Sequence, residues 1–240
     1  MAIIIALSVT ACGSGAGGSD DSAQPSNNNS SATNTNTSSN NSDSSSTNSS
    51  SNNPANTTTV LTSNYIKDQD VAKTINSPNL NTLQVDGQNV QLTFPGISVG
   101  TFLVIKENAI SGGHLSYARY GIVSANNSRY AFSQGYSTLD MPTTGTAIYT
   151  GQATYDKGSV RAETGKSIFH VDYGKKTING TVAINSDNIQ LSGTINGNAF
   201  SGNKNGTQMQ GGFYGPKAAE LSGTFQNKAE GYTGAFGARK

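Results

Sequence analysis

The stretch GGFYGPKAAELSGTFQNKAEGYTGAFGARK, residues 211–240, decides the fold of this chain. Every second position from 219 to 225 is apolar or glycine: Ala219, Leu221, Gly223 and Phe225. The positions between them are polar: Glu220, Ser222 and Thr224. Strict alternation of this kind is typical of a half-buried antiparallel strand. Because a glycine on the inward face leaves room for aromatic side chains across a tight barrel, the pattern favours a small closed sheet.

The same alternation recurs upstream and predicts a series of strands. They lie near residues 145–155, 167–174, 177–184, 188–196, 198–202, 208–214, 218–225 and 232–237. In the second of them, Phe169 and Val171 point inward, whereas His170 points outward beside Asp172. Eight strands of this length can close into a barrel whose interior is just filled by side chains.

Residues 211–240 resemble the C-terminal β-barrel signature of the transferrin-binding protein B family, a family of Gram-negative surface lipoproteins. The resemblance extends over about residues 115–240 and includes Met141–Gly151 at the start of the barrel. It implies an all-β chain in which a small antiparallel handle sheet, residues 60–135, precedes an eight-stranded antiparallel barrel, residues 136–240. The ligand does not follow, because family members share the barrel and differ in what they bind.

The handle segment carries its own strand signals. Leu83–Val85 and Val90–Phe94 flank Asp86-Gly87, a hairpin turn sequence. The run Phe102–Ile105 is apolar at four consecutive positions, which predicts a strand covered on both faces.

Cys12 is the single cysteine of the chain, so no internal disulfide forms. The run LSVTAC, residues 7–12, resembles a bacterial lipobox, in which the cysteine is acylated and the preceding residues are removed. The alternative is a free cysteine at the end of a signal peptide. Residues 1–11 lack a basic region and are short for a complete signal, so we expect the true start to lie upstream. In lipoprotein sorting, Gly13 after the cysteine favours the outer membrane.

From Gly13 to Thr59 the chain is rich in Ser, Asn and Thr and contains no Val, Ile, Leu, Met or aromatic residue. Such a segment cannot bury enough apolar surface to offset the entropy of ordering. We therefore expect residues 12–59 to be a lipidated, disordered tether that holds the folded part away from the membrane.

Three residues of the handle are candidate ligand contacts: His114, Tyr117 and Tyr120. His114 follows Ser111-Gly112-Gly113, which predicts a mobile loop. An exposed loop histidine is the simpler interpretation. The alternative is an axial ligand of haem, with the two tyrosines covering the porphyrin, so haem is a candidate cofactor. No metal-binding motif such as HExxH or CxxC occurs in the sequence.

An enzyme is the weakest hypothesis. Gly96-Ile97-Ser98-Val99-Gly100 satisfies the GxSxG motif of serine hydrolases, but that motif works at a strand-to-helix elbow. Here a strand is expected to follow, so the segment is interpreted as a glycine-rich turn. A net charge of +1 gives no electrostatic basis for binding nucleic acid. No apolar run is long enough for a transmembrane helix, so membrane contact is expected through the lipid anchor alone.

These observations predict a non-enzymatic, surface-exposed lipoprotein of the outer membrane that captures a host-derived ligand. The resemblance implies a host protein partner: an iron carrier or haem protein first, and a complement regulator as the alternative. An outer-membrane receptor or translocator is a further candidate partner, and we expect a monomer. The handle, between Val60 and Phe132, is expected to carry the binding residues.

Overall fold

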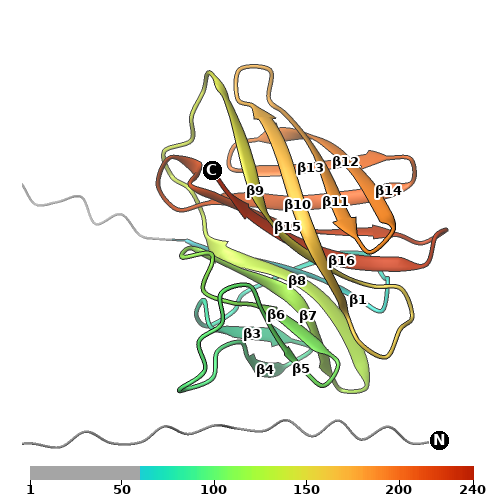
Figure 1. The fold of residues 1–240 in the computed structure, drawn as a ribbon. Coiled ribbons are helices and arrows are strands. Elements are labelled where there is room, and N and C mark those ends of the chain that lie inside the picture. The colour runs from blue at the N-terminus through green and yellow to red at the C-terminus, as the bar shows by residue number, and fades with distance from the viewer. Residues whose placement is uncertain (1–59) are drawn as a thin grey trace, which may run out of the picture. The chain divides into compact units, whose positions relative to one another are not determined.

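The computed structural model describes residues 60–240, which fold into strands and one short 3-10 turn. Figure 1 shows the two parts of this region, a sheet formed by the first half and a barrel formed by the second. The acylation expected at Cys12 and the tether expected over residues 13–59 lie outside the described residues. No helix within residues 60–240 is long and apolar enough to cross a bilayer.

The first part is a six-stranded antiparallel sheet, here called the handle sheet. Its strands in spatial order are β2 (Lys73–Ile75), β1 (Leu61–Lys67), β8 (Ser128–Tyr136), β7 (Ala118–Ala125), β6 (Asn108–Ser111) and β5 (Phe102–Ile105). A separate hairpin of β3 (Thr82–Val85) and β4 (Gln88–Gln91) turns at Asp86-Gly87, as predicted. Both turn residues have positive φ, 45° and 78°, as a two-residue hairpin requires.

The hairpin and one face of the handle sheet enclose a core of their own. Its buried members come from both layers: Tyr65, Leu83, Val85, Leu92, Ile110, Val123, Tyr130 and Phe132. Asp86 fastens the turn to the sheet, because its carboxylate accepts hydrogen bonds from the hydroxyls of Tyr65 and Tyr130, each at 2.9 Å. It also pairs with the Lys67 ammonium at 2.5 Å.

The prediction that Phe102–Ile105 is covered on both faces is wrong. Val104 is 47% exposed and Ile105 is 36% exposed. The reason is position, because β5 is the edge strand of the handle sheet and pairs only with β6. By contrast, the GxSxG segment is a turn followed by this strand, as expected.

The second part is a closed antiparallel barrel in which each strand pairs with the next along the chain. Its strands are β9 (Thr146–Asp156), β10 (Glu163–Asp172), β11 (Thr177–Ile184), β12 (Asp187–Asn196), β13 (Ala199–Lys204), β14 (Thr207–Tyr214), β15 (Glu220–Asn227) and β16 (Tyr232–Arg239). Pairing of β16 with β9 closes the cylinder. Each predicted strand corresponds to one of these. The largest boundary difference is at β10, which begins four residues earlier because Glu163–Lys166 pairs with the end of the long β9.

The barrel interior is packed by alternate residues, as predicted. Phe169 and Val171 are buried, whereas His170 between them is exposed. On β15, Leu221 and Phe225 belong to the same interior core. Gly223 lies between them, and the Phe236 ring occupies the space where its side chain would be. Glycine on the inward face therefore makes room for an aromatic ring, as the sequence indicated.

The outer face of β15 differs from the prediction. The alternation predicted a half-buried strand, yet every residue of β15 is buried. The handle sheet packs against this part of the barrel wall and covers the polar face. Ser222 and Ser133 of β8 share a hydrogen bond at 2.8 Å, and Thr224 donates to Asn64 of β1 at 3.2 Å. The contact between the handle sheet and the outer face of β15 and β16 is called the junction below.

Candidate functional site

Glu220 binds the handle to the barrel at one end of the junction. Its carboxylate accepts hydrogen bonds from the backbone N–H groups of Ser116, at 2.6 Å, and Tyr117, at 2.8 Å. The side chain is 4% exposed. Burial raises the pKa of Glu220, and these N–H groups, with the nearby Arg119 guanidinium, partly oppose that rise. Glu220 thereby fixes the loop that carries two of the predicted ligand residues.

His114, which is half-buried, and Tyr120, which is buried, form one pair. The His114 Nε2 atom lies 2.9 Å from the Tyr120 hydroxyl, and Tyr120 is fully buried against Gly237 of β16. The His114 Nδ1 atom is buried and has no hydrogen-bond partner of good geometry within residues 60–240. Burial lowers the pKa of His114, and the positive charges of Arg119 and Arg239 lower it further. The backbone groups of Gly100 and Thr101 oppose part of this shift, and the lowered pKa favours the neutral form of the imidazole.

Tyr117 lies away from this pair, in a groove on another side of the junction. The Tyr117 groove has a volume of about 660 Å³ and is lined by Tyr117, Tyr136, Ser137, Leu139, Asp140, Gly215 and Pro216. Leu139 is 55% exposed and Tyr117 is 36% exposed. The structure therefore brings His114 and Tyr120 together, and places Tyr117 in a separate, mainly apolar groove.

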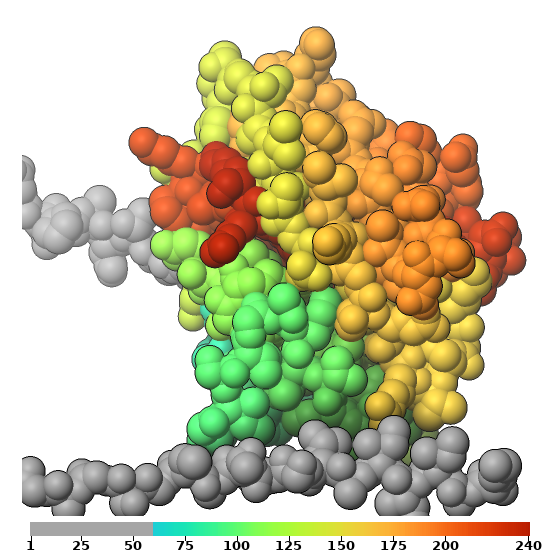
Figure 2. Space-filling view, viewed as in Figure 1, coloured from blue at the N-terminus to red at the C-terminus, as the bar shows by residue number. Residues whose placement is uncertain are grey.

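A second hollow, the His114 cleft, lies between the handle and the outer wall of β9, β10 and β11. Its volume is about 500 Å³, and its lining is Thr101, His114, Thr150, Gly151, Gln152, Lys166, Ser167, Ile168, Thr181, Ala183 and Arg239. Figure 2 shows the C-terminal residues in red beside the green handle and the yellow barrel wall on this face. Two cations, Lys166 and Arg239, therefore lie in one hollow with a neutral histidine.

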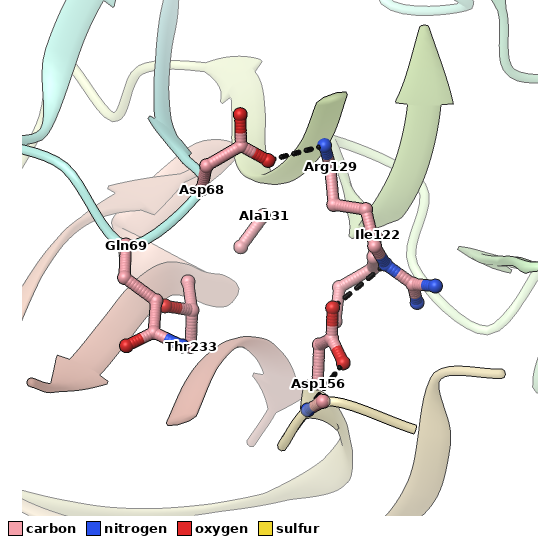
Figure 3. A pocket seen from close by; sticks show the side chains of 8 residues that line it. Asp68, Gln69, Ile122, Arg129, Ala131, Asp156 and Thr233 are labelled. Carbon is pink, nitrogen blue, oxygen red and sulfur yellow. Dashed lines mark hydrogen bonds and ion pairs between the residues drawn. The ribbon is translucent and has the colours of Figure 1, made fainter. Parts of the chain in front are cut away.

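A third and smaller cavity, of about 230 Å³, is built around an ion pair (Figure 3). The Arg129 Nε atom of β8 lies 2.7 Å from the Asp156 carboxylate of β9. The Arg129 backbone N–H donates to Asp68 at 2.8 Å, and its guanidinium donates to the carbonyl groups of Val160 and Glu107. Because every charged group here already has a partner, this cavity is best explained as a link between handle and barrel.

Sequence reasoning missed several residues of these sites. Leu139 gave no signal, because an exposed leucine in a connecting segment belongs to no pattern. Lys166 was predictable as an outward residue from the alternation of β10, but its proximity to Arg239 depends on closure of the barrel. Glu220 was placed on the correct face, although its partners in the handle were not predicted.

The fold and the junction define a class of protein: a small β-sheet locked to the side of a closed eight-stranded barrel, with ligand-sized grooves where they meet. Residues 141–240 match a family model described as the C-lobe and N-lobe beta barrels of Tf-binding protein B. The chain belongs to the family of transferrin-binding protein B-like β-barrel lobes, which are binding proteins and not enzymes.

The matches to similar proteins cover different shares of those proteins. An uncharacterized protein of Haemophilus influenzae is 30% identical over 197 residues, which cover 70% of this chain and 68% of that protein. Transferrin-binding protein B of Moraxella catarrhalis is 30% identical over 154 residues, 48% of this chain but only 21% of that protein. The crystal structure of isotype 1 transferrin-binding protein B from Neisseria meningitidis has a TM-score of 0.59 at 22% identity. It matches 75% of this chain and 43% of that one. The last similarity shows the fold alone.

Proposed function

We propose that this chain is a surface-displayed lipoprotein of the outer membrane that captures a host protein, with an iron carrier or haem protein as the first candidate. The observation that carries the proposal is the Tyr117 groove. It places exposed apolar side chains on a rigid support, with Tyr117 held by Glu220 and Leu139 beside it. Aromatic and apolar side chains grouped in this way are typical anchors of protein interfaces.

The remaining parts have roles that follow from the sequence. Cys12 would carry the acyl chains, and each buried methylene of such a chain contributes about 0.8 kcal/mol of membrane affinity. Residues 13–59 would act as the tether. The chain would work as a monomer and would contact the membrane through its anchor, with an outer-membrane receptor or translocator as a further partner. Because the chain spans about a fifth of the Moraxella protein, transferrin itself is not carried over as the ligand.

A serum pull-down tests the proposal. The full chain with Cys12→Ser, which removes the acylation site, is immobilised, exposed to host serum and analysed by mass spectrometry. We expect capture of one iron-carrier or haem protein, and loss of capture with Tyr117→Ala and with Leu139→Ser. Val160→Ser is the matched control, because Val160 is 81% exposed and lies outside the Tyr117 groove. Capture of a complement regulator would instead support the alternative partner. Capture that neither groove variant reduces would contradict the assignment of the binding site to the Tyr117 groove.

The second candidate function is a haem carrier that uses His114, supported by the aromatic rings around the imidazole. The Phe102 and Tyr120 rings lie 6.5 Å and 5.7 Å from the His114 ring. Coordination of iron through His114 Nε2 would require its bond to the Tyr120 hydroxyl to break. Addition of haemin decides between the candidates, since a carrier would show a Soret shift that disappears with His114→Ala. No shift, or one that His114→Ala leaves unchanged, would exclude this function.

A further inference from the structure

The outer wall of the barrel beside His114 gathers positive charge without acidic partners. Lys166 and Arg239 both line the His114 cleft, and neither forms an ion pair within residues 60–240. No aspartate or glutamate lines the cleft in the described part of the chain. The nearest acid along the strand register is Glu220 of β15, whose Cα lies opposite that of Arg239 in β16 without an ion pair between the side chains. Its two oxygens are already occupied by the N–H groups of Ser116 and Tyr117.

The strand register places the two cations within reach of one ligand group. Arg239 is directly opposite Thr150 of β9, and Thr150 is opposite Ile168 of β10. Lys166 lies two residues before Ile168 on the same outward face. With strands about 4.8 Å apart and a rise of about 3.4 Å per residue, the two Cα atoms are about 12 Å apart. Two long, flexible side chains can converge on a single anion across that distance.

The other side chains of the cleft indicate what the anion is attached to. Hydroxyl and amide groups surround the cations: Thr101, Thr150, Gln152 and Thr181. Apolar atoms make up most of the exposed lining of the cleft, and Ile168, which is 40% exposed, and Ala183 contribute to them. Hydroxyl and amide groups donate and accept hydrogen bonds with sugar hydroxyls, and aliphatic side chains pack against the C–H face of a sugar ring.

We propose that the His114 cleft binds an acidic saccharide, with Lys166 and Arg239 holding its carboxylate or sulfate and the threonine and glutamine side chains holding its hydroxyl groups. Charge-assisted contacts of this kind fix the orientation of a ligand as well as its affinity. The site is separate from the Tyr117 groove, so a host glycoprotein could engage both. It needs no iron coordination by His114.

The test uses the full chain with Cys12→Ser and three matched sugars: sialyllactose with a carboxylate, 3′-sulfolactose with a sulfate, and lactose with neither. Isothermal titration and saturation-transfer NMR measure binding. We expect an acidic sugar to bind with a Kd of about 1 mM or tighter, and lactose at least about tenfold more weakly. Lys166→Gln and Arg239→Gln should each weaken binding by about fivefold, the upper range for a solvent-exposed ion pair. Comparison of the carboxylated and the sulfated sugar shows which of the two acidic groups the cleft binds.

The matched control is Lys228→Gln, which removes the same charge from an exposed turn outside the cleft and should leave the affinity unchanged. Thermal unfolding of each variant verifies the fold. The proposal is overturned if neither acidic sugar binds, if lactose binds equally well, or if both cleft variants keep full affinity. Tighter binding of a hexaglutamate peptide than of both acidic sugars would also overturn it, because that result assigns the cleft to an acidic protein segment. A serum pull-down that fails while the sugars bind would contradict only the proposed capture of a host protein.

Discussion

At Gly237 the outer face of the barrel presents no side chain, and Tyr120 and Leu115 of the handle occupy the space. We predict that Gly237→Ala destabilises the fold by about 1–3 kcal/mol, because the added methyl group must displace a fully buried ring. Urea unfolding measures the change. Gly100→Ala is the control, since a methyl group there meets no atom within 4 Å. Equal destabilisation by the two substitutions would contradict close packing at Gly237.

Glu220 gives a pH dependence of unusual sign. Its pKa is raised in the folded state, mainly by burial, so the folded chain binds a proton more readily than the unfolded chain. Protonation of Glu220 therefore contributes stability below the unfolded carboxyl pKa of about 4.3, and that contribution is lost as the pH rises through the folded pKa.

The comparison with Glu220→Gln checks this sign. The neutral variant keeps the shape but replaces one acceptor oxygen by a donor, so we expect a loss of about 1–2 kcal/mol. The loss relative to the wild type should be larger at pH 4 than at pH 7.5, measured by thermal unfolding at both values. A loss that grows towards high pH would show that the ionised carboxylate is the favoured form.

For single residues, the sequence predicted the face of the strand on which a side chain lies better than it predicted the neighbours of that side chain. Alternation placed Leu221 and Phe225 inside the barrel and Glu220 outside, because side-chain direction depends on the strand alone. Burial of Glu220 depends on a second layer, the handle sheet, which no local pattern records. His114 was expected in a mobile loop for the same reason, yet it is fastened to Tyr120.

Among the elements, the β3–β4 hairpin depends on one side chain. Asp86 accepts hydrogen bonds from Lys67, Tyr65 and Tyr130, which lower its pKa to about 2. We predict that Asp86→Asn costs about 1–2 kcal/mol at pH 7, through loss of these charge-assisted bonds. Asparagine is the suitable substitution because it tolerates the positive φ of this position.

The contribution of Asp86 to stability depends on pH with the sign usual for a carboxylate whose pKa is lowered by folding. The folded pKa of Asp86 lies below its ordinary value of 3.8, so its contribution is complete above about pH 4 and is lost as the pH falls towards 2. Chemical denaturation of the wild type and Asp86→Asn at pH 7 and pH 2.5 should show the difference shrinking at the lower pH. An unchanged difference would mean that the contribution of Asp86 does not involve its charge.

Strand positions were predictable because each barrel strand carries a period-two pattern bounded by turn residues. That β5 is an edge strand was not predictable, because the run Phe102–Ile105 has the same sequence whether its strand is central or at an edge. Sheet order decides that question, and it arises from pairings between segments far apart in the chain, such as β1 with β8.

At the scale of the whole molecule, the candidate sites form because the barrel closes and because the handle packs against its wall. Lys166 and Arg239 are more than seventy positions apart in the chain and approach only because β16 pairs with β9. The Tyr117 groove likewise combines a handle loop with Gly215 and Pro216 of the barrel. Sequence reasoning therefore identified single loop residues, whereas the grooves required the tertiary arrangement.

The junction also predicts that handle and barrel unfold together. The barrel has a large interior core, whereas the handle core holds eight buried residues, which is small for an independently stable unit. The handle gains further burial at the junction, where Leu115, Ala118 and Tyr120 pack with Tyr214 and Ala235 of the barrel. The Thr138 N–H also donates to the Phe213 carbonyl at 2.9 Å. We therefore expect a single calorimetric transition whose measured enthalpy equals the van't Hoff enthalpy.

Gly237→Ala sharpens this last prediction, because it perturbs the junction and leaves the handle core untouched. In one cooperative unit, the substitution lowers the midpoint of the single transition, and hydrogen exchange accelerates equally in β8 of the handle and β11 of the barrel. If the handle were independently stable, the substitution would divide the transition in two, and exchange in β11 would keep its original rate. That outcome would mean that handle and barrel each fold on their own, and that the grooves at the junction open while the barrel stays folded.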